Sequence, residues 1–470
     1  MELYSYTIIE IQNKIRNKEV SVTEVIQSAL QRIEQLADSK TKAFITVTEE
    51  TALNDAKKLD EELHKGNRLP LLAGVPMAVK DNICIEGVKT TCASKILENF
   101  TAPYSATVVE KLKHQKAIFL GKLNMEEFAM SSSAEILGFF REGAATGVAD
   151  GEIFFALGSD TGGSIRQSAA LCGVVGLKPT YGRVSKYGLI TSASSLDQIG
   201  PITKTVKDAA IVLEAISGQD FFDPISSDVP VDNYQEHLCG DIKGLKIGIP
   251  KEYFPERLNP HIKEAVLKAA AQFENMGAVV EECSLPHTEH AVTSYYIIAS
   301  AEASSNLARF DGVRYGYRNT DANDLLNMYT KTREEGFGAE VKKRILLGTY
   351  ALSVGRYDDY FLRAQKVRTL VKNDFDKVFG RYDCLLTPVS LTNVFNRKEK
   401  ADNPLSIYLN DLFTVSANMA GLPALSIPCG FSEGLPIGLQ LIGKAFDEKT
   451  ILRAAYAYEQ SVGVRRDSNV

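Results

Sequence analysis

The chain has 470 residues, of which 44% are hydrophobic and 24% charged, and its formal net charge is −6. This composition is that of a globular protein with a large core, and it excludes a disordered or fibrous chain. The negative net charge argues against a broad basic surface that binds a nucleic acid backbone. Any nucleic acid is therefore expected to be held by a partner.

The sequence also indicates a compartment and a redox state. Charged side chains interrupt the first twenty residues, so these lack the apolar core of a signal peptide, and no apolar run approaches the length of a membrane span. A cytoplasmic location is expected. The seven scattered cysteines include no C-x-x-C pair, which predicts reduced thiols. The closest histidines, His287 and His290, lie in a proline-containing connection, so neither a metal site nor a cofactor site is expected in this chain.

The first strong secondary-structure signal is a helix that begins after Ser21. Ser21 and Glu24 have the spacing of a capping box, and apolar residues recur at helical spacing from Val22 to Leu36. Short apolar runs further along the chain predict buried strands. These runs are 75–79, 117–120, 153–157, 245–249 and 384–386.

Helical patterns alternate with these strands. One begins near Ser105, another at Thr205 with Asp208 completing a capping box, and a third at Asn259, with Pro260 in its first turn. Because parallel strands need crossover connections that are usually helical, this alternation predicts an α/β fold. We expect a mixed, mostly parallel central sheet that is covered by helices on both faces.

The domain organisation is expected to be simple. The chain has no internal repeat and no Gly/Pro-rich linker of the kind that separates domains. A single domain over residues 1–470 is therefore predicted, with a helical segment of about 1–65 packed on it. The polar stretch of about 219–239 is interpreted as a long surface excursion.

The segment that says most about chemistry is 156–166, which reads Ala-Leu-Gly-Ser-Asp-Thr-Gly-Gly-Ser-Ile-Arg and follows a predicted strand. Two glycines before a serine allow main-chain N–H groups to converge on one point, as in an oxyanion hole. Ser164 is the candidate nucleophile, and the N–H groups of Thr161, Gly162 and Gly163 are the candidate oxyanion donors. Taken alone, a Gly-Gly-Ser segment is more often a glycine-rich turn with an incidental serine. Its spacing is not that of a Walker A phosphate loop, and no lysine follows the serine.

A serine nucleophile needs a base, and the sequence has neither a G-x-S-x-G elbow nor an obvious histidine partner. Lys80 ends the strand-like run 74–82, and an amine in apolar surroundings can be neutral and accept a proton. A lysine at a strand end is ordinarily a solvated charge. The two segments together make Lys80 and Ser164 a candidate catalytic pair.

Three runs, 74–82, 158–166 and 172–183, together resemble the amidase-signature family. The resemblance covers nearly the whole chain. It implies an α/β/α sandwich that hydrolyses carboxamides with a Lys, cis-Ser, Ser triad. By this resemblance Lys80 is the base and Ser164 is the residue that is acylated.

Within that family, the runs 89–100, 195–203 and 309–317 are most similar to the A subunits of tRNA-dependent amidotransferases. Such subunits release ammonia from glutamine, and a partner uses it to amidate glutamyl-tRNA(Gln) or aspartyl-tRNA(Asn). The resemblance implies a heterotrimer with subunits B and C, in which the partner that binds the mischarged tRNA also uses ATP and Mg²⁺.

The same resemblance assigns three residues to glutamine recognition, namely Tyr315, Arg368 and Asp411. The assignment is chemically sensible, because a guanidinium suits the carboxylate of an amino acid and a carboxylate suits its ammonium group.

One element of the family pattern is missing. The family carries a Ser-Ser-Gly-Gly-Ser segment whose first serine relays protons between the lysine and the nucleophile. Alignment back from Ser164 places this serine pair on Phe140 and Arg141, just before a run of small residues that resembles the helix after the motif. Phe140 has no exchangeable proton, and the loss of one member of a coupled triad costs several orders of magnitude in rate.

Two interpretations of this anomaly stay open: a deletion in a divergent or inactive homologue, and an error in the gene reading around residues 136–147. A substitute relay from Ser131, Ser132 or Ser133 is the third arrangement that the sequence allows. Three functions are accordingly considered. The leading one is the glutamine-hydrolysing component of an amidotransferase, and the others are a non-catalytic scaffold in the same complex and a stand-alone amidase for another amide.

Overall fold

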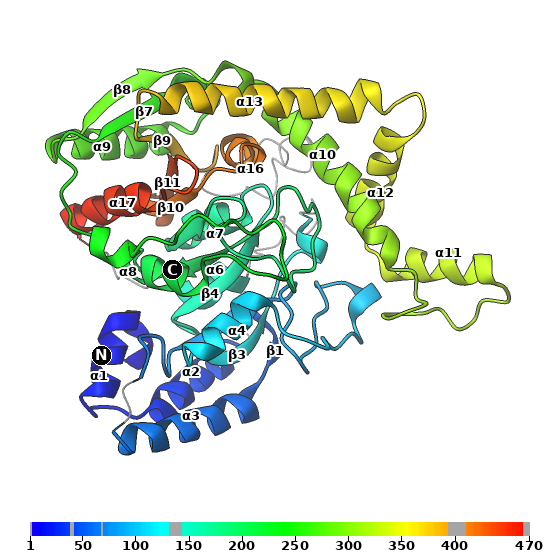
Figure 1. Ribbon diagram of the computed structural model, residues 1–470, viewed down its shortest axis with the longest axis horizontal. Coiled ribbons are helices and arrows are strands. Elements are labelled where there is room, and N and C mark those ends of the chain that lie inside the picture. The colour runs from blue at the N-terminus through cyan, green and yellow to red at the C-terminus, as the bar shows by residue number, and fades with distance from the viewer. Residues whose placement is uncertain (1, 38–41, 67–68, 131–142, 393–409, 464–470) are drawn as a thin grey trace.

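The computed structural model describes residues 2–37, 42–66, 69–130, 143–392 and 410–463. Its centre is an 11-stranded sheet in the order β1-β3-β2-β4-β6-β5-β10-β11-β9-β7-β8 (Figure 1). The strands are β1 (Phe44–Val47), β2 (Pro76–Lys80), β3 (Ile118–Leu123), β4 (Phe155–Asp160), β5 (Val175–Lys178), β6 (Gln198–Thr203), β7 (Lys246–Pro250), β8 (Val279–Cys283), β9 (Cys384–Pro388), β10 (Ala424–Ser432) and β11 (Leu435–Gly443).

Helices pack along the sheet and extend beyond one end of it. They are α1 (Ile8–Arg16), α2 (Val22–Leu36), α3 (Glu49–His64), α4 (Thr107–His114), α6 (Gly143–Ala149), α7 (Ser164–Cys172), α8 (Val206–Ile216), α9 (Pro260–Asn275), α10 (Ala291–Asn306), α11 (Leu325–Gly336), α12 (Ala339–Leu352), α13 (Arg363–Phe379), α16 (Val415–Met419) and α17 (Glu448–Val462). Helix α8 contacts α4 and α17, α6 contacts α7, and both groups pack against the sheet. The predicted α/β sandwich with a mixed sheet is thus confirmed.

The expectation that the sheet is mostly parallel is wrong. The pairs β2–β3, β2–β4, β7–β9 and β7–β8 are parallel, and the other six pairings of described strands are antiparallel. Apart from β1 at one edge, the antiparallel strands that were not predicted form the middle of the sheet. Three of them contain a proline, at Pro201, Pro428 and Pro436, and a proline inside an apolar run normally argues against a central strand.

The other predicted elements are present with small shifts at their ends. The five predicted strands are β2, β3, β4, β7 and β9, and the capping box of Ser21 and Glu24 opens α2. The hydroxyl of Thr205 caps α8, but the reciprocal bond from the backbone of Thr205 to Asp208 is absent. One oxygen of the Asp208 carboxylate accepts a hydrogen bond from the N–H of Ile8 at 3.2 Å.

The sheet topology decides where the candidate site lies. Strands β2 and β4 are parallel neighbours, so their carboxyl ends meet at one edge of the sheet, where Lys80 ends β2 and the loop to α7 begins. Helices α10 and α12 extend from the body beyond this edge (Figure 1). None of the helices in the described ranges combines the length and the apolar character that a membrane crossing requires.

Candidate active site

The loop between β4 and α7 places Ser164 as the first residue of α7, at the positive end of a helix. Both glycines before it are required by their surroundings. A Cβ on Gly162 would lie 2.5 Å from the hydroxyl of Tyr295, and Gly163 has a φ of +146° and would collide with Thr414. The chain can therefore approach its neighbours this closely only without side chains at these two positions.

A buried ion pair closes the base of this loop. Nε and Nη2 of Arg166 donate to the two carboxylate oxygens of Asp160 at 3.0 and 2.9 Å. Burial is the largest single influence and raises the pKa of Asp160, but Arg166, Lys178 and Asn418 together lower it, so the pKa lies below its ordinary value. Arg166 also donates to Gln440 at 2.6 Å and to Asn418, so the loop is anchored to the C-terminal part of the chain.

A second buried carboxylate, that of Asp197, contacts the loop at Thr161. The hydroxyl of Thr161 donates to Asp197 at 2.5 Å, and the other oxygen of Asp197 accepts the N–H groups of Ser192 and Ala193 at 2.8 and 3.0 Å. Burial raises the pKa of Asp197 to about 6, although these hydrogen bonds act in the opposite direction. Asp197 thereby holds the first of the three candidate oxyanion residues.

The motif Lys80-Asp81-Asn82 joins the end of β2 to the end of β4. Lys80 is 1% exposed, and its Nζ donates to the carbonyl oxygen of Ser159 at 3.3 Å, while Asn82 donates to the hydroxyl of Ser159 at 3.0 Å. Asp81 forms a fully buried ion pair of 3.1 Å with Lys122 on β3. The structure therefore brings Lys80 to the strand from which the Ser164 loop departs.

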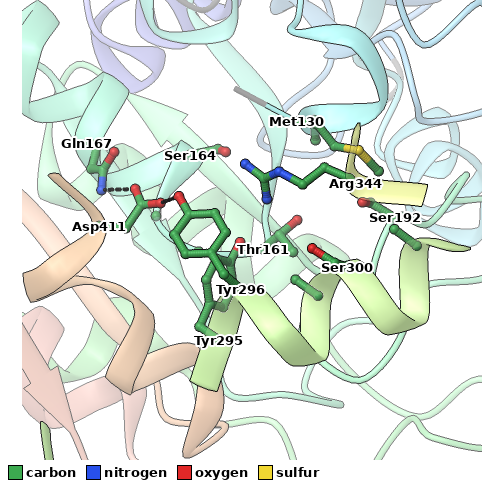
Figure 2. A pocket seen from close by; sticks show the side chains of 15 residues that line it. Met130, Thr161, Ser164, Gln167, Ser192, Tyr295, Tyr296, Ser300, Arg344 and Asp411 are labelled. Atoms are coloured by element: carbon green, nitrogen blue, oxygen red, sulfur yellow. Dashed lines mark hydrogen bonds between the residues drawn. The ribbon is translucent and has the colours of Figure 1, made fainter. Parts of the chain in front are cut away.

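A pocket opens on this loop and extends to α10, α12 and the segment before α16 (Figure 2). Ser164 lines it together with Thr161, Gly162 and Gly163, all of which were selected from the sequence. Asp411, the third selected binding residue, lines it as well.

The pocket has a cationic side and an anionic side. The guanidinium of Arg344 points into it, and the carboxylate of Asp411 lies across from it (Figure 2). Tyr296 contacts both: its hydroxyl donates to Asp411, and the Arg344 guanidinium lies 4.5 Å from the centre of its ring. Burial raises the pKa of Asp411. Two opposite charges flanking a candidate nucleophile suit an amino acid zwitterion with a reactive side chain.

Two of the selected binding residues lie elsewhere. Tyr315 is not among the residues that line the pocket, and its ring packs 5.7 Å from that of Phe100. Arg368 is also outside the lining. Its guanidinium donates to the hydroxyl and the carbonyl oxygen of Ser195 at 2.8 and 2.9 Å and to the carbonyl oxygen of Met419 at 2.8 Å, so it fixes the loop that carries Asp197.

Sequence reasoning missed Arg344 and the tyrosines of α10. Arg344 follows Lys342 and Lys343 in an amphipathic helix, a pattern that is typical of solvated charges. In the structure its side chain is only 8% exposed. No local pattern in the sequence indicates this burial, because it arises from the packing of α12 on α10.

The residues on which the missing proton relay was placed, Phe140 and Arg141, lie outside the described residues, as do Ser131, Ser132 and Ser133. The small-residue run that follows them forms helix α6, which packs against α7. The part of the chain that is described holds no group of three or more His, Cys, Asp or Glu side chains that could bind a metal ion.

Lys80 and the loop that carries Ser164 both lie within the residues that a known family model matches. The Amidase family model matches residues 24–141 and 142–452. The chain belongs to the amidase family.

Within that family, similar proteins carry one more specific name. The A subunit of glutamyl-tRNA(Gln) amidotransferase from Geobacillus kaustophilus is 53% identical over the whole of both chains. The protein of the same name from Moorella thermoacetica is 55% identical and covers 99% of this chain and 98% of its own.

Solved structures agree with these relatives. The A subunit of glutamyl-tRNA(Gln) amidotransferase from Thermotoga maritima has a TM-score of 0.80 at 40% identity, covering 98% of this chain and 95% of its own. The peptide amidase of Stenotrophomonas maltophilia has a TM-score of 0.81 at 27% identity, covering 97% and 96%. The fold is thus shared by amidases that differ in substrate.

The comparisons also bear on the missing segment. The family match is divided between residues 141 and 142, next to the positions on which the serine pair was placed. The alignment with the Geobacillus kaustophilus relative spans 485 positions and includes all 470 residues of this chain. That relative therefore has positions that this chain lacks.

Proposed function

We propose that this chain is the glutamine-hydrolysing A subunit of a tRNA-dependent amidotransferase that converts Glu-tRNA(Gln) to the amidated form. The observation that carries the proposal is the pocket that joins Ser164 to Arg344 and Asp411. Arg344 binds the α-carboxylate of glutamine and Asp411 binds its α-ammonium group, which directs the side-chain amide toward the nucleophile.

The chemistry proceeds in two halves. Ser164 Oγ forms a bond to the amide carbon, its proton passes to the Lys80 amine, and N–H groups of the loop from Thr161 to Gly163 stabilise the oxyanion. The C–N bond then breaks, ammonia leaves with the proton from Lys80, and a glutamyl ester remains on Ser164. Water hydrolyses this ester and releases glutamate.

The wider assignment follows from the sequence resemblance to A subunits of tRNA-dependent amidotransferases, and the relatives named as such A subunits support it. The chain assembles with two partner subunits, B and C, in the cytoplasm, and the ammonia passes to the partner that binds the mischarged tRNA. That partner, and not this chain, uses ATP and Mg²⁺. Tyr315 and Arg368 support the site from outside the pocket, because their contacts are with the protein itself.

The proposal is tested with the purified complex by measuring ammonia release from glutamine. We expect Ser164→Ala to lower kcat by at least about 10³-fold, because the reaction loses its nucleophile. The same variant should still amidate tRNA when ammonium chloride replaces glutamine, which shows that the complex is intact. Equal glutaminase rates in the two complexes would remove Ser164 from the reaction.

The missing serine pair favours a second candidate function, a scaffold that keeps the fold and the partner surface but hydrolyses glutamine poorly or not at all. This candidate predicts normal assembly and normal amidation with ammonium chloride, but no amidation with glutamine. Replacing residues 131–142 with the corresponding segment of the Geobacillus kaustophilus relative would then raise kcat by several orders of magnitude. An unchanged kcat after the exchange would count against this candidate.

A further inference from the structure

The hydroxyl of Thr414 contacts the loop that precedes Ser164. Thr414 is fully buried, and its Oγ1 donates a hydrogen bond to the carbonyl oxygen of Gly162 at 2.6 Å. The same oxygen accepts a hydrogen bond from Nε2 of Gln167 at 2.9 Å. A longer contact of 3.3 Å joins it to the carbonyl oxygen of Asp411. The hydroxyl of Thr414 thus accepts one hydrogen bond and donates another. Of the two carbonyl oxygens within its reach, that of Gly162 is the nearer.

The contact to Gly162 bears on the next N–H group. The peptide between Gly162 and Gly163 is a rigid plane whose C=O and N–H point in opposite directions. Holding the carbonyl of Gly162 toward Thr414 therefore directs the N–H of Gly163 away from Thr414. Because two glycines flank this peptide, few steric restraints of their own fix its orientation.

Gln167 extends the contact to the anionic side of the pocket. Its Nε2 donates to Oδ1 of Asp411 at 3.0 Å, in addition to its bond with Thr414, and the other oxygen of Asp411 accepts from Tyr296 (Figure 2). One chain of hydrogen bonds therefore runs from Asp411 through Gln167 and Thr414 to the carbonyl of Gly162.

We infer that Thr414 is a positioning residue that turns the Gly163 N–H toward the substrate oxygen, and that Gln167 couples this orientation to Asp411. The inference rests on the proposed function, since it assigns Gly163 to the oxyanion hole and Asp411 to the ammonium group of glutamine. It adds that the residue group that recognises the substrate and the group that stabilises the oxyanion are physically connected.

The first test is the glutaminase activity of the complete complex carrying Thr414→Val, which replaces the hydroxyl with a methyl group of similar size. We expect kcat to fall by about 10- to 100-fold, somewhat less than for the removal of an oxyanion donor, while KM for glutamine changes by less than about threefold. Thr414→Ser keeps the hydroxyl and should restore most of kcat. A wild-type kcat in the valine variant, or a loss confined to KM, would overturn the inference.

The coupling is tested with Gln167→Met, alone and combined with Thr414→Val. The single change should raise KM as well as lower kcat, because Asp411 loses a partner. In the double variant kcat should be no lower than in the single variant with the lower kcat, because both changes release the same peptide. Additive losses in kcat would show that Gln167 and Thr414 act separately. If the valine variant does not assemble, Thr414→Ala takes its place, with amidation from ammonium chloride as the control for assembly.

A complex without glutaminase activity would refute the proposed function but would still allow a test of Thr414. Crystal structures of the full chain with Thr414→Val and with Thr414→Ser then decide the matter. A Gly162–Gly163 peptide that turns in the valine variant and stays in place in the serine variant supports the inference. A peptide that stays in place in both variants overturns it.

Discussion

At the scale of single residues, the two arginines near the site differ in what their guanidinium groups contact. The guanidinium of Arg368 donates three hydrogen bonds, to Ser195 and Met419. The guanidinium of Arg344 points into the pocket (Figure 2), and its Nε donates a hydrogen bond to Glu340 at 2.8 Å. Arg344 lines the pocket beside Ser164, and Arg368 does not. The difference separates a binding role from a supporting role.

We therefore predict different kinetic effects for Arg344→Lys and Arg368→Lys. Losing the planar fork at position 344 should raise KM for glutamine by about tenfold or more, because a lysine cannot form the bidentate contact to a carboxylate. Arg368→Lys should mainly lower the midpoint of thermal unfolding. Steady-state kinetics of both complexes check this, and a larger rise in KM for Arg368→Lys would restore Arg368 as the substrate-binding arginine.

A second prediction concerns the pH dependence of stability. The pKa of Asp197 is raised from 3.8 to about 6, so between these values the folded state binds the proton and the unfolded state does not. The contribution of Asp197 to stability is therefore larger at low pH and is lost as the pH rises through about 6. Relative to Asp197→Asn, the wild type should lose about 1.4 kcal/mol of unfolding free energy between pH 5 and pH 7.5.

Urea denaturation of both proteins at the two pH values measures this difference. The titrations of all other groups occur in both proteins and cancel in the comparison. A difference between wild type and variant that does not change with pH would contradict the assignment of a raised pKa to Asp197.

Among the residues of the site, those that lie in one local pattern could be predicted from the sequence. Short motifs contain Ser164, its two glycines and Lys80, and the residue types in these motifs indicate their chemistry. The structure places the serine and the glycines in the lining of one pocket. Arg344, Gln167 and Thr414 carry no such pattern. Their places depend on contacts between segments that are far apart in the chain, and residue type alone does not reveal these contacts.

At the scale of the elements, the junction of β4 and α7 depends on the buried pair of Asp160 and Arg166. Both side chains are fully buried, and their hydrogen bonds satisfy both carboxylate oxygens. Removing one partner of such a pair leaves an uncompensated charge in the interior.

We predict that Arg166→Met lowers the free energy of unfolding by about 3–5 kcal/mol. The matched control is Arg381→Met, because Arg381 pairs with Glu281 at 2.6 Å on the surface, with side chains 68% and 42% exposed. That change should cost less than about 1 kcal/mol. Urea denaturation compares the two variants, and similar losses would mean that burial does not set the strength of the Asp160 pair.

The strands of the sheet differ in how well the sequence predicts them, for a physical reason. Strands β2, β4, β7 and β9 are apolar runs that helices follow, a pattern that indicates parallel strands. Strands β10 and β11 are joined by only two residues, Glu433 and Gly434, and contain Pro428 and Pro436. A tight hairpin needs no helix, so the alternation on which the prediction depended is absent in the middle of the sheet.

At the scale of the whole molecule, one sheet passes through all the described strands, and one apolar core contains residues from Ile8 near the start to Tyr458 in α17. A smaller cluster around Phe128, Phe310 and Phe337 lies beside it. A continuous core of this kind favours the single-domain interpretation, which stays a prediction.

Differential scanning calorimetry of the isolated chain tests that interpretation. We expect one transition for the body of the protein, because no group of strands can separate without breaking the sheet. Two well-separated transitions of comparable enthalpy would indicate two domains instead.

The anchoring of Arg166 to Asn418 and Gln440 has a consequence for protein synthesis. Translation reaches Ser164 before Asn418 and Gln440, which follow it by 254 and 276 residues. A chain that ends before these residues carries the proposed nucleophile without this support, so we expect glutamine hydrolysis to begin only after Gln440 has been added and the chain has folded.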